Sequence, residues 1–134
     1  MNGGLTARHL QLILAGIFIL LGGWCMLLPH MVEGLVFRPG FRHMSTTSAI
    51  LMGCFGAQAV LAGLVIWWSE FKPQSFLVFG LAGSLPFFAF NYYFYFVLQA
   101  FTEWMLLDFA GNLGILSCGL IGYRLKSREL HATD

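Results

Sequence analysis

The chain has 134 residues, of which 58% are hydrophobic and only 10% are charged, and its formal net charge is +1. A soluble domain carries about 25% charged residues, and a chain this short cannot hide so many apolar side chains in one aqueous core. The composition therefore predicts a protein embedded in membrane lipid. The absence of a basic block argues against a nucleic-acid partner.

Four apolar runs are long enough to cross a bilayer as helices, which needs about 20 residues for about 30 Å of hydrocarbon. They cover residues 9–28, 47–68, 75–98 and 102–123. Backbone in lipid must satisfy its own hydrogen bonds, so helices are expected rather than open strands. Short links at 69–74 and 99–101 favour antiparallel neighbours. The sequence predicts a single all-α membrane domain over residues 1–134, an antiparallel up-down four-helix bundle with a polar tail at 124–134.

The link between the first two runs is longer and chemically mixed. Residues 31–37 are expected to form a short amphipathic segment in the membrane interface, followed by a turn at Arg38-Pro39-Gly40. His30, Glu33 and His43 also lie in this link, but their spacing completes no known ligand pattern. No metal site is therefore predicted.

Basic residues set the expected orientation. Five lie on the side of the two termini, and two lie on the other side: Arg8, Lys72, Arg124, Lys126 and Arg128 against Arg38 and Arg42. Because loops rich in Lys and Arg remain in the cytoplasm, both termini are predicted to be cytoplasmic.

The fourth run carries a carboxylate, Asp108, where ionisable groups are rare. A carboxylate at the centre of a membrane helix costs about 2.5–3.5 kcal/mol on insertion scales, so a compensating environment is expected. Counting 1.5 Å per residue places Asn91 at the depth of Asp108, and Gln58 and Asn112 at the level below. These four polar side chains are expected to meet in one outward-opening pocket.

Aromatic residues of the third run, Phe87, Phe88 and Tyr95, lie three or four positions from Asn91 and would frame that pocket. An amide among aromatic rings suits a lipophilic ligand such as a quinone, sterol, carotenoid or lipid. Pro86 is expected to kink the run and help to open the pocket. The competing interpretation is that the polar groups only join helices and the rings only pack or face lipid.

Small residues recur at four-residue spacing in two of the runs, which allows close approach of helices in lipid. The predicted packing positions are Ala49, Gly53 and Ala57 in the second run, and Ala110, Gly114, Cys118 and Gly122 in the fourth. On a helical wheel Ala110 lies far from both Asp108 and Asn112, so this stripe is expected on a largely different face.

No catalytic or nucleotide-binding motif is present, so no catalytic residue is predicted, and the sequence does not identify a cofactor. Exposed faces and small-residue stripes favour a non-catalytic accessory or assembly subunit, surrounded by membrane lipids, in a homo-oligomer or larger membrane complex. The alternative is a binder, carrier or small enzyme for a lipophilic ligand around Asp108 and Asn91. If the protein were an enzyme, Asp108 would be the proton donor or acceptor.

Overall fold

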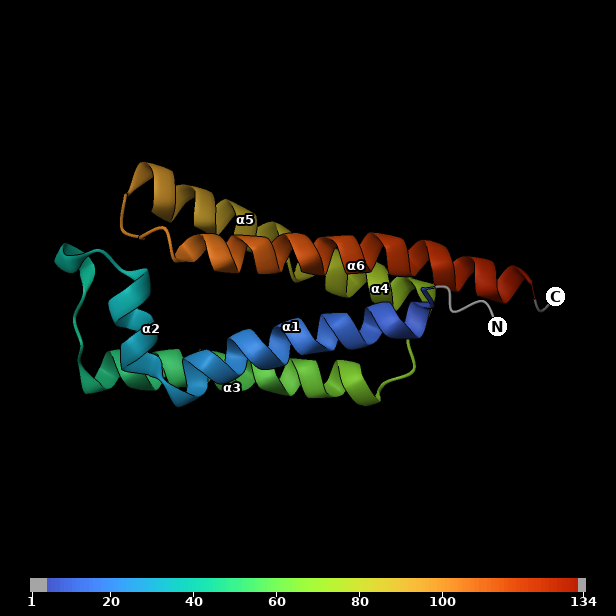
Figure 1. The fold of residues 1–134 in the computed structure, drawn as a ribbon, viewed down its shortest axis with the longest axis horizontal. Coiled ribbons are helices and arrows are strands. Elements are labelled where there is room, and N and C mark those ends of the chain that lie inside the picture. The colour runs from blue at the N-terminus through green and yellow to red at the C-terminus, as the bar shows by residue number, and fades with distance from the viewer. Residues whose placement is uncertain (1–4, 133–134) are drawn as a thin grey trace.

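A computed structural model describes residues 5–132 and shows an elongated helical protein (Figure 1). The α-helices are α1 (Ala7–Leu27), α2 (Pro29–Val36), α3 (Thr46–Trp68), α4 (Pro73–Ala82), α5 (Leu85–Tyr92) and α6 (Met105–His131). A 3-10 turn, η1 (Pro39–Phe41), follows α2, and a π-helical turn, η2 (Tyr93–Val97), extends α5. Four segments are long and apolar enough to cross a membrane: α1, α3, Pro73–Val97 and α6. The prediction of an all-α membrane bundle is confirmed.

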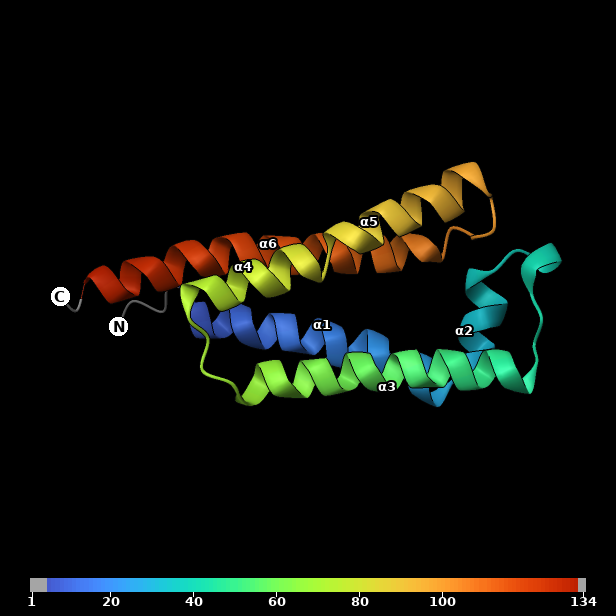
Figure 2. The same cartoon turned by 180° about the vertical axis from the view of Figure 1, so that it is seen from behind.

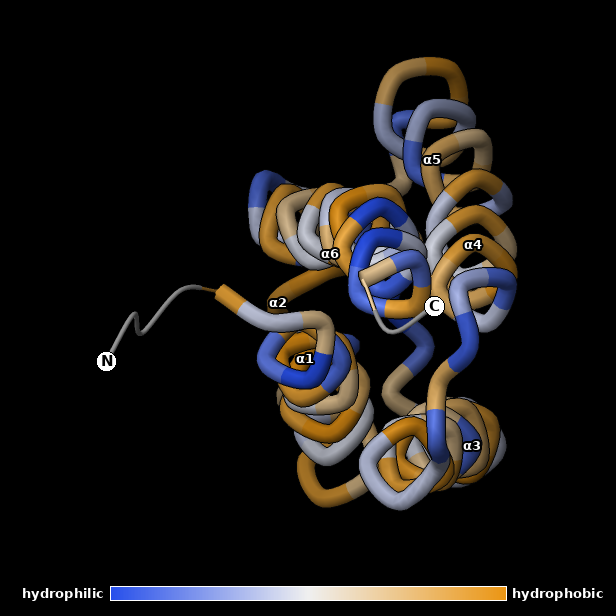
Figure 3. Tube along the Cα trace, turned by 90° about the vertical axis from the view of Figure 1, so that its right-hand side faces the viewer, coloured by the Kyte–Doolittle hydropathy of each residue, from blue (hydrophilic) through white to orange (hydrophobic). Residues whose placement is uncertain are grey.

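The long helices lie side by side along one axis (Figure 1). The first and last described residues lie at one end, here called the terminal end. The short helix α2 crosses the opposite end, here called the α2 end. Seen along the axis, α1, α3, α4 and α6 lie at the four corners of the bundle, and α5 lies beyond α4 (Figure 3). Helix α1 packs along both α3 and α6, and α4 packs on α6.

Many large apolar side chains face outward, as a protein solvated by lipid requires. Leu20 is 75% exposed and Trp68 is 77% exposed, although both lie in candidate spans. The structure therefore describes a small multi-pass membrane protein. Its orientation in the membrane stays a prediction.

N-capping side chains set the first residues of α1 and α3. Thr6 caps α1 by accepting a hydrogen bond from the His9 backbone N–H, and Ser45 caps α3 through Ser48. The Ser45 and Ser48 hydroxyls each bond the other's backbone N–H at 3.1 Å. These caps satisfy N–H groups that have no partner within their own helix.

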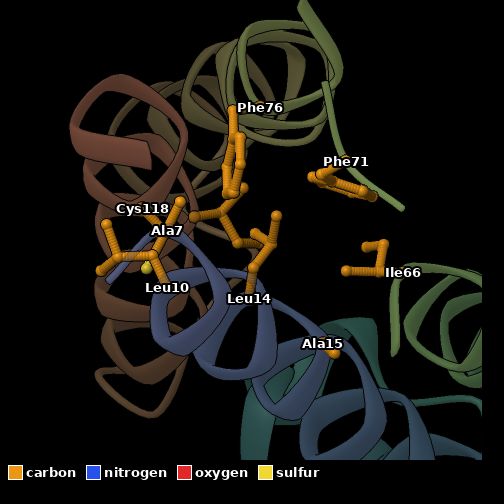
Figure 4. Packing of buried hydrophobic residues seen from close by; sticks show 9 residues of the cluster. Ala7, Leu10, Leu14, Ala15, Ile66, Phe71, Phe76 and Cys118 are labelled. Atoms are coloured by element: carbon orange, nitrogen blue, oxygen red, sulfur yellow. The ribbon is translucent and has the colours of Figure 1, made fainter. Parts of the chain in front are cut away.

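The terminal end is closely packed (Figure 4). Leu10, Leu14, Ile66 and Phe76 are 5% exposed or less there. Helices α4 and α6 cross at Gly80 and Gly119, where a Cβ on Gly80 would lie 2.7 Å from the Gly119 Cα. Only residues without a side chain allow backbones to approach this closely.

The predicted small-residue stripes are only partly correct. Gly114, Cys118 and Gly122 do face the neighbouring helices: a Cβ on Gly114 would lie 3.0 Å from Ile17, and Cys118 and Gly122 are buried. Ala57 and Ala110 are exposed, whereas Ala49 and Gly53 are half-buried.

The close contact between α1 and α3 instead uses Gly22, Gly56 and Gly63. Four-residue steps drift by about 40° around a helix, so a stripe at that spacing leaves the interface, whereas a seven-residue step drifts by only about 20°. The same drift carries the later part of the α6 stripe, Cys118 and Gly122, onto the buried side that also holds Asn112. The expectation of two largely separate faces on this helix is therefore wrong.

The third span is broken rather than gently kinked. Helix α4 ends at Ala82, and Pro86 lies in the first turn of α5, so the break falls at Gly83 and Ser84. The Ser84 hydroxyl donates to the Gly80 carbonyl at 2.5 Å, which replaces a backbone bond lost near the break. Beyond it, α5 swings away from α1 and α3 (Figures 1 and 2).

The predicted polar tail is largely helical, because α6 continues to His131. Its last turns are tied to the first helix: Glu129 accepts a hydrogen bond from the Ala7 backbone N–H at 3.2 Å and approaches Lys126 at 3.3 Å. A carboxylate at a helix N-terminus is favoured by the helix dipole. Residues 133–134 of the predicted tail lie outside the described residues.

Candidate functional site

The α2 end is closed by backbone hydrogen bonds between two links that are far apart in sequence. The Arg38 N–H donates to the Ala100 carbonyl at 2.9 Å, and the Thr102 N–H donates to the Val36 carbonyl at 2.7 Å. The Arg38 Nε–H adds a bond to the Phe101 carbonyl at 2.9 Å. Together these bonds join the segment after α2 to the segment before α6. The result is a roof that connects the α1–α3 pair to the α5–α6 pair.

A buried carboxylate, Glu33, fixes this roof to the start of α3. Its Oε1 accepts the backbone N–H groups of His43 and Met44 at 2.8 and 2.7 Å, and its Oε2 accepts the Ser48 hydroxyl at 2.7 Å. The Ser48 hydrogen bond, aided by the two backbone bonds and by nearby His30, holds the pKa of Glu33 below its usual value, although burial opposes this shift.

Glu33 is therefore engaged in structure. Within residues 5–132, no group of three or more His, Cys, Asp or Glu side chains is placed to hold a metal ion.

Beneath the roof lies a cavity of about 410 Å³, here called the Asp108 cavity. Its wall is almost wholly apolar and comes from every helix except α4, with the segments that flank α2, α5 and α6. Phe18, Gly83 and Ile115 bound it toward the terminal end, and Val32, Val36 and Phe101 lie under the roof. Among the described residues that line it, Asp108 is the single Asp, Glu, Lys, Arg or His.

Asp108 is held by two amides. The Nδ2 groups of Asn91 and Asn112 both donate to its Oδ2, at 2.9 and 2.8 Å. Both asparagines are 4% exposed, whereas Asp108 is half-buried and lines the cavity. No donor in the described part of the chain reaches its other oxygen, Oδ1. The carboxylate is thus fixed through Oδ2, while Oδ1 has no donor among the described residues.

Only some of the other predicted site residues line the cavity. Phe87 lines the cavity with Asp108 and Asn112, whereas Asn91 lies behind Asp108 and contacts the cavity only through it. Phe88 packs edge-on against Phe109, with ring centres 5.2 Å apart, and is not part of the lining. Tyr95 lies in η2, outside the lining.

Gln58 is exposed on α3 and does not line the cavity. Counting residues along a span gives the depth of a side chain but not the direction in which it points. The expectation that Gln58 and Tyr95 line the pocket is therefore wrong.

Sequence reasoning missed the contribution of α1 and the roof. Trp24, Cys25 and Phe37 line the cavity, but apolar residues within apolar runs carry no signal that separates a cavity wall from a lipid-facing surface. The usable signal was the Gly83-Ser84 pair before Pro86, because that break moves α5 outward and leaves space beside Asp108.

Part of the cavity wall is made of residues that are themselves exposed. Phe55 of α3 and Phe90 of α5 both line it, and they are 50% and 47% exposed. The rings of Phe55 on α3 and Phe87 on α5 contact each other, with centres 6.3 Å apart. The roof lies at the α2 end of this cavity, and the expectation of an outward-opening pocket stays a prediction.

Comparison with known proteins identifies no relative: no family model, no curated protein and no solved structure matches this chain. The proposed function therefore rests on the geometry and chemistry of the site.

Proposed function

We propose that the protein binds a lipophilic small molecule in the Asp108 cavity, with the polar head of the ligand against Asp108 and its apolar body among the aromatic rings. The observation that carries this proposal is a single carboxylate, fixed by two buried amides, in an otherwise apolar cavity within the membrane-spanning part of the protein. A charged residue at such a depth is costly and commonly marks a functional site.

The size and composition of the cavity support the same proposal. A volume of about 410 Å³ falls within the range of about 300–1,000 Å³ that is typical of small-molecule sites. Such sites are mostly hydrophobic and aromatic, with a few polar groups that fix the orientation of the ligand. In this proposal Asp108 and Asn112 orient the ligand, which enters from the lipid beside the exposed rings of Phe55 and Phe90.

A purely structural role explains the carboxylate less well. Two asparagines can bond each other across helices without a charge, and such bonds contribute about 0.6 kcal/mol on average in membranes. Here both amides converge on Oδ2 of Asp108, so they orient the carboxylate as well as joining α5 to α6. This arrangement resembles the support that a pre-organised binding group needs.

The test is to purify the protein from its membrane and identify co-purifying lipophilic molecules by mass spectrometry. We expect Asp108→Asn to fold normally and to lose the bound molecule. The matched control is Glu103→Gln, because Glu103 is an exposed carboxylate just before α6 that does not line the cavity. If Asp108→Asn retained the same molecule at the same occupancy, the proposed role would be refuted.

A second candidate function, a subunit of a homo-oligomer or larger membrane complex, is favoured by Gln58. This amide lies near the middle of α3, is exposed, and makes no hydrogen bond within the described residues. An unpaired amide in hydrocarbon is costly, and a partner helix would satisfy it. We expect Gln58→Leu to shift a complex in mild detergent toward the monomer. A wild-type protein that is already a stable monomer without partners would contradict this function.

We also propose that both termini are cytoplasmic, since five of the seven Lys and Arg residues belong to the terminal side. A C-terminal reporter that is active on only one side of the membrane tests this orientation. Activity on the outer side would overturn it.

A further inference from the structure

The charged and polar residues of the Asp108 cavity indicate the chemical class of its ligand. A carboxylate carries a full negative charge, yet no Lys, Arg or His in the described chain lines the cavity. Both hydrogen bonds that Asp108 accepts come from neutral amides, and both go to Oδ2. The described residues therefore orient the Asp108 carboxyl group without a cationic partner, and Oδ1 is left without a donor.

The polar surface beside Asp108 is also rich in acceptors. The side-chain Nδ2 of Asn112 donates to Asp108, and its side-chain oxygen, Oδ1, has no hydrogen-bond partner within the described residues. The side-chain oxygen of Asn91, Oδ1, also lacks a partner, but it is buried outside the cavity lining. A ligand group that only accepts hydrogen bonds, such as the carbonyl of a quinone, would face oxygen atoms here. A ligand that donates would complete the site.

The walls favour a cation over a neutral donor. Two indole rings, Trp24 and Trp104, and the phenyl rings of Phe87 and Phe90 line the same cavity as Asp108. The negative face of an aromatic ring attracts an ammonium group, and this attraction grows when the site excludes water. A hydrogen bond between a charged donor and a carboxylate is also about twice as strong as one between neutral groups.

We propose that the ligand is a lipophilic amine in its protonated form, with its ammonium N–H directed at Asp108 Oδ1 and its hydrocarbon part reaching toward Phe55 and Phe90. This inference rests on the proposed function, because it names the head group of the molecule that the Asp108 cavity binds. It excludes carotenoids and quinones as the preferred ligands. The same chemistry is available from a free amine and from the ammonium head of phosphatidylethanolamine.

The experiment measures binding of radiolabelled dodecylamine to the protein in phosphatidylcholine nanodiscs at pH 7, where the amine is charged. Dodecanol has the same chain and a neutral donor head, so it serves as the matched competitor. We expect the amine to bind about 10- to 100-fold more tightly than the alcohol, because charge-assisted bonding and the aromatic rings both act on the cation. Asp108→Asn should remove this preference, whereas Glu103→Gln should preserve it.

Separate outcomes distinguish the inference from the proposed function. Equal affinity for amine and alcohol, abolished by filling the cavity with Met52→Trp, would overturn the ammonium assignment and leave the cavity as a binding site. Binding that Met52→Trp does not reduce would show that the probe lies outside the cavity and would overturn both.

Phosphatidylethanolamine added to the nanodiscs identifies the source of the amine. Competition by that lipid at a few per cent of the bilayer would assign the site to a lipid head group. Absence of competition would assign it to a free amine.

Discussion

The apolar helices are held together differently at the two ends of the bundle. At the terminal end, α4 and α6 meet backbone to backbone at Gly80 and Gly119, and Phe76 fills the space beside Gly122. At the α2 end the helix pairs diverge, and hydrogen bonds across the roof hold them at a distance around the Asp108 cavity (Figure 1). The difference arises within one span, at the break between α4 and α5.

This contrast shows how a small membrane protein can hold a cavity open. Lipid is as apolar as the helix surfaces, so association depends on close packing and on interhelical hydrogen bonds rather than on exclusion of water. The terminal end supplies the packing, and the roof supplies the hydrogen bonds. Substitutions that disturb packing at the terminal end are therefore expected to unfold the protein, whereas substitutions at the α2 end are expected to alter the cavity.

The largest effect is expected from Gly119→Leu. A Cβ at this position would lie 2.5 Å from the Gly80 Cα and 2.8 Å from the Phe76 carbonyl oxygen, so the helices would have to separate. We expect a loss of about 3 kcal/mol or more, measured by thermal or denaturant unfolding in detergent. Gly23→Leu, in the half of α1 nearer the α2 end, is the control because a Cβ there meets nothing within 4 Å. Equal destabilisation by both changes would contradict the contrast.

A pair of identical truncations on α1 gives the next largest effect. Leu14 is 0% exposed at the terminal end, whereas Leu21 lines the Asp108 cavity. We expect Leu14→Ala to lower the free energy of unfolding by about 2 kcal/mol, because the space it leaves stays unfilled, and Leu21→Ala to lower it by less than about 1 kcal/mol. The same unfolding measurement compares them, and a reversed order would show that the α2 end is the better packed.

Sequence and structure agree where chemistry is strongly constrained. The four spans, the end of α1 before Pro29, and the shared depth of Asn91 and Asp108 could be predicted, because bilayer thickness and proline geometry leave few alternatives. The directions of Gln58 and Tyr95 could not be predicted, because they depend on how each helix rotates against its neighbours. The roof also escaped prediction, since its bonds join backbone atoms far apart in the sequence, Arg38 with Ala100 at 2.9 Å and Val36 with Thr102 at 2.7 Å, without a side-chain pattern.

A smaller and pH-dependent effect is expected at Glu33. Its pKa is lowered in the folded protein, first by the Ser48 hydroxyl and then by the backbone bonds, so the carboxylate stabilises the fold while it is ionised. This contribution is fully present above the unfolded pKa and is lost as the pH falls through the lower folded pKa. We expect Glu33→Gln to cost about 1 kcal/mol at pH 7 and much less in acid.

The check is the unfolding free energy of both proteins at pH 7 and below pH 4, with Glu70→Gln as the control because Glu70 is exposed at the terminal side. The difference between wild type and Glu33→Gln should shrink as the pH falls. His30 acts on Glu33 as a nearby charge, so His30→Gln tested alongside separates the effect of this neighbour from that of the carboxylate. A constant difference across this range would rule out the ionised carboxylate as the source of the stability.

The most direct test of the central claim is photolabelling of the protein in nanodiscs with a lipophilic amine that carries a diazirine, followed by mapping of the labelled residues. The account predicts labels on the cavity wall, at Cys25, Phe87 and Met105, with their loss in Asp108→Asn and their retention in Glu103→Gln. Labels confined to lipid-facing positions such as Leu20 and Trp68, unchanged in Asp108→Asn, would contradict it.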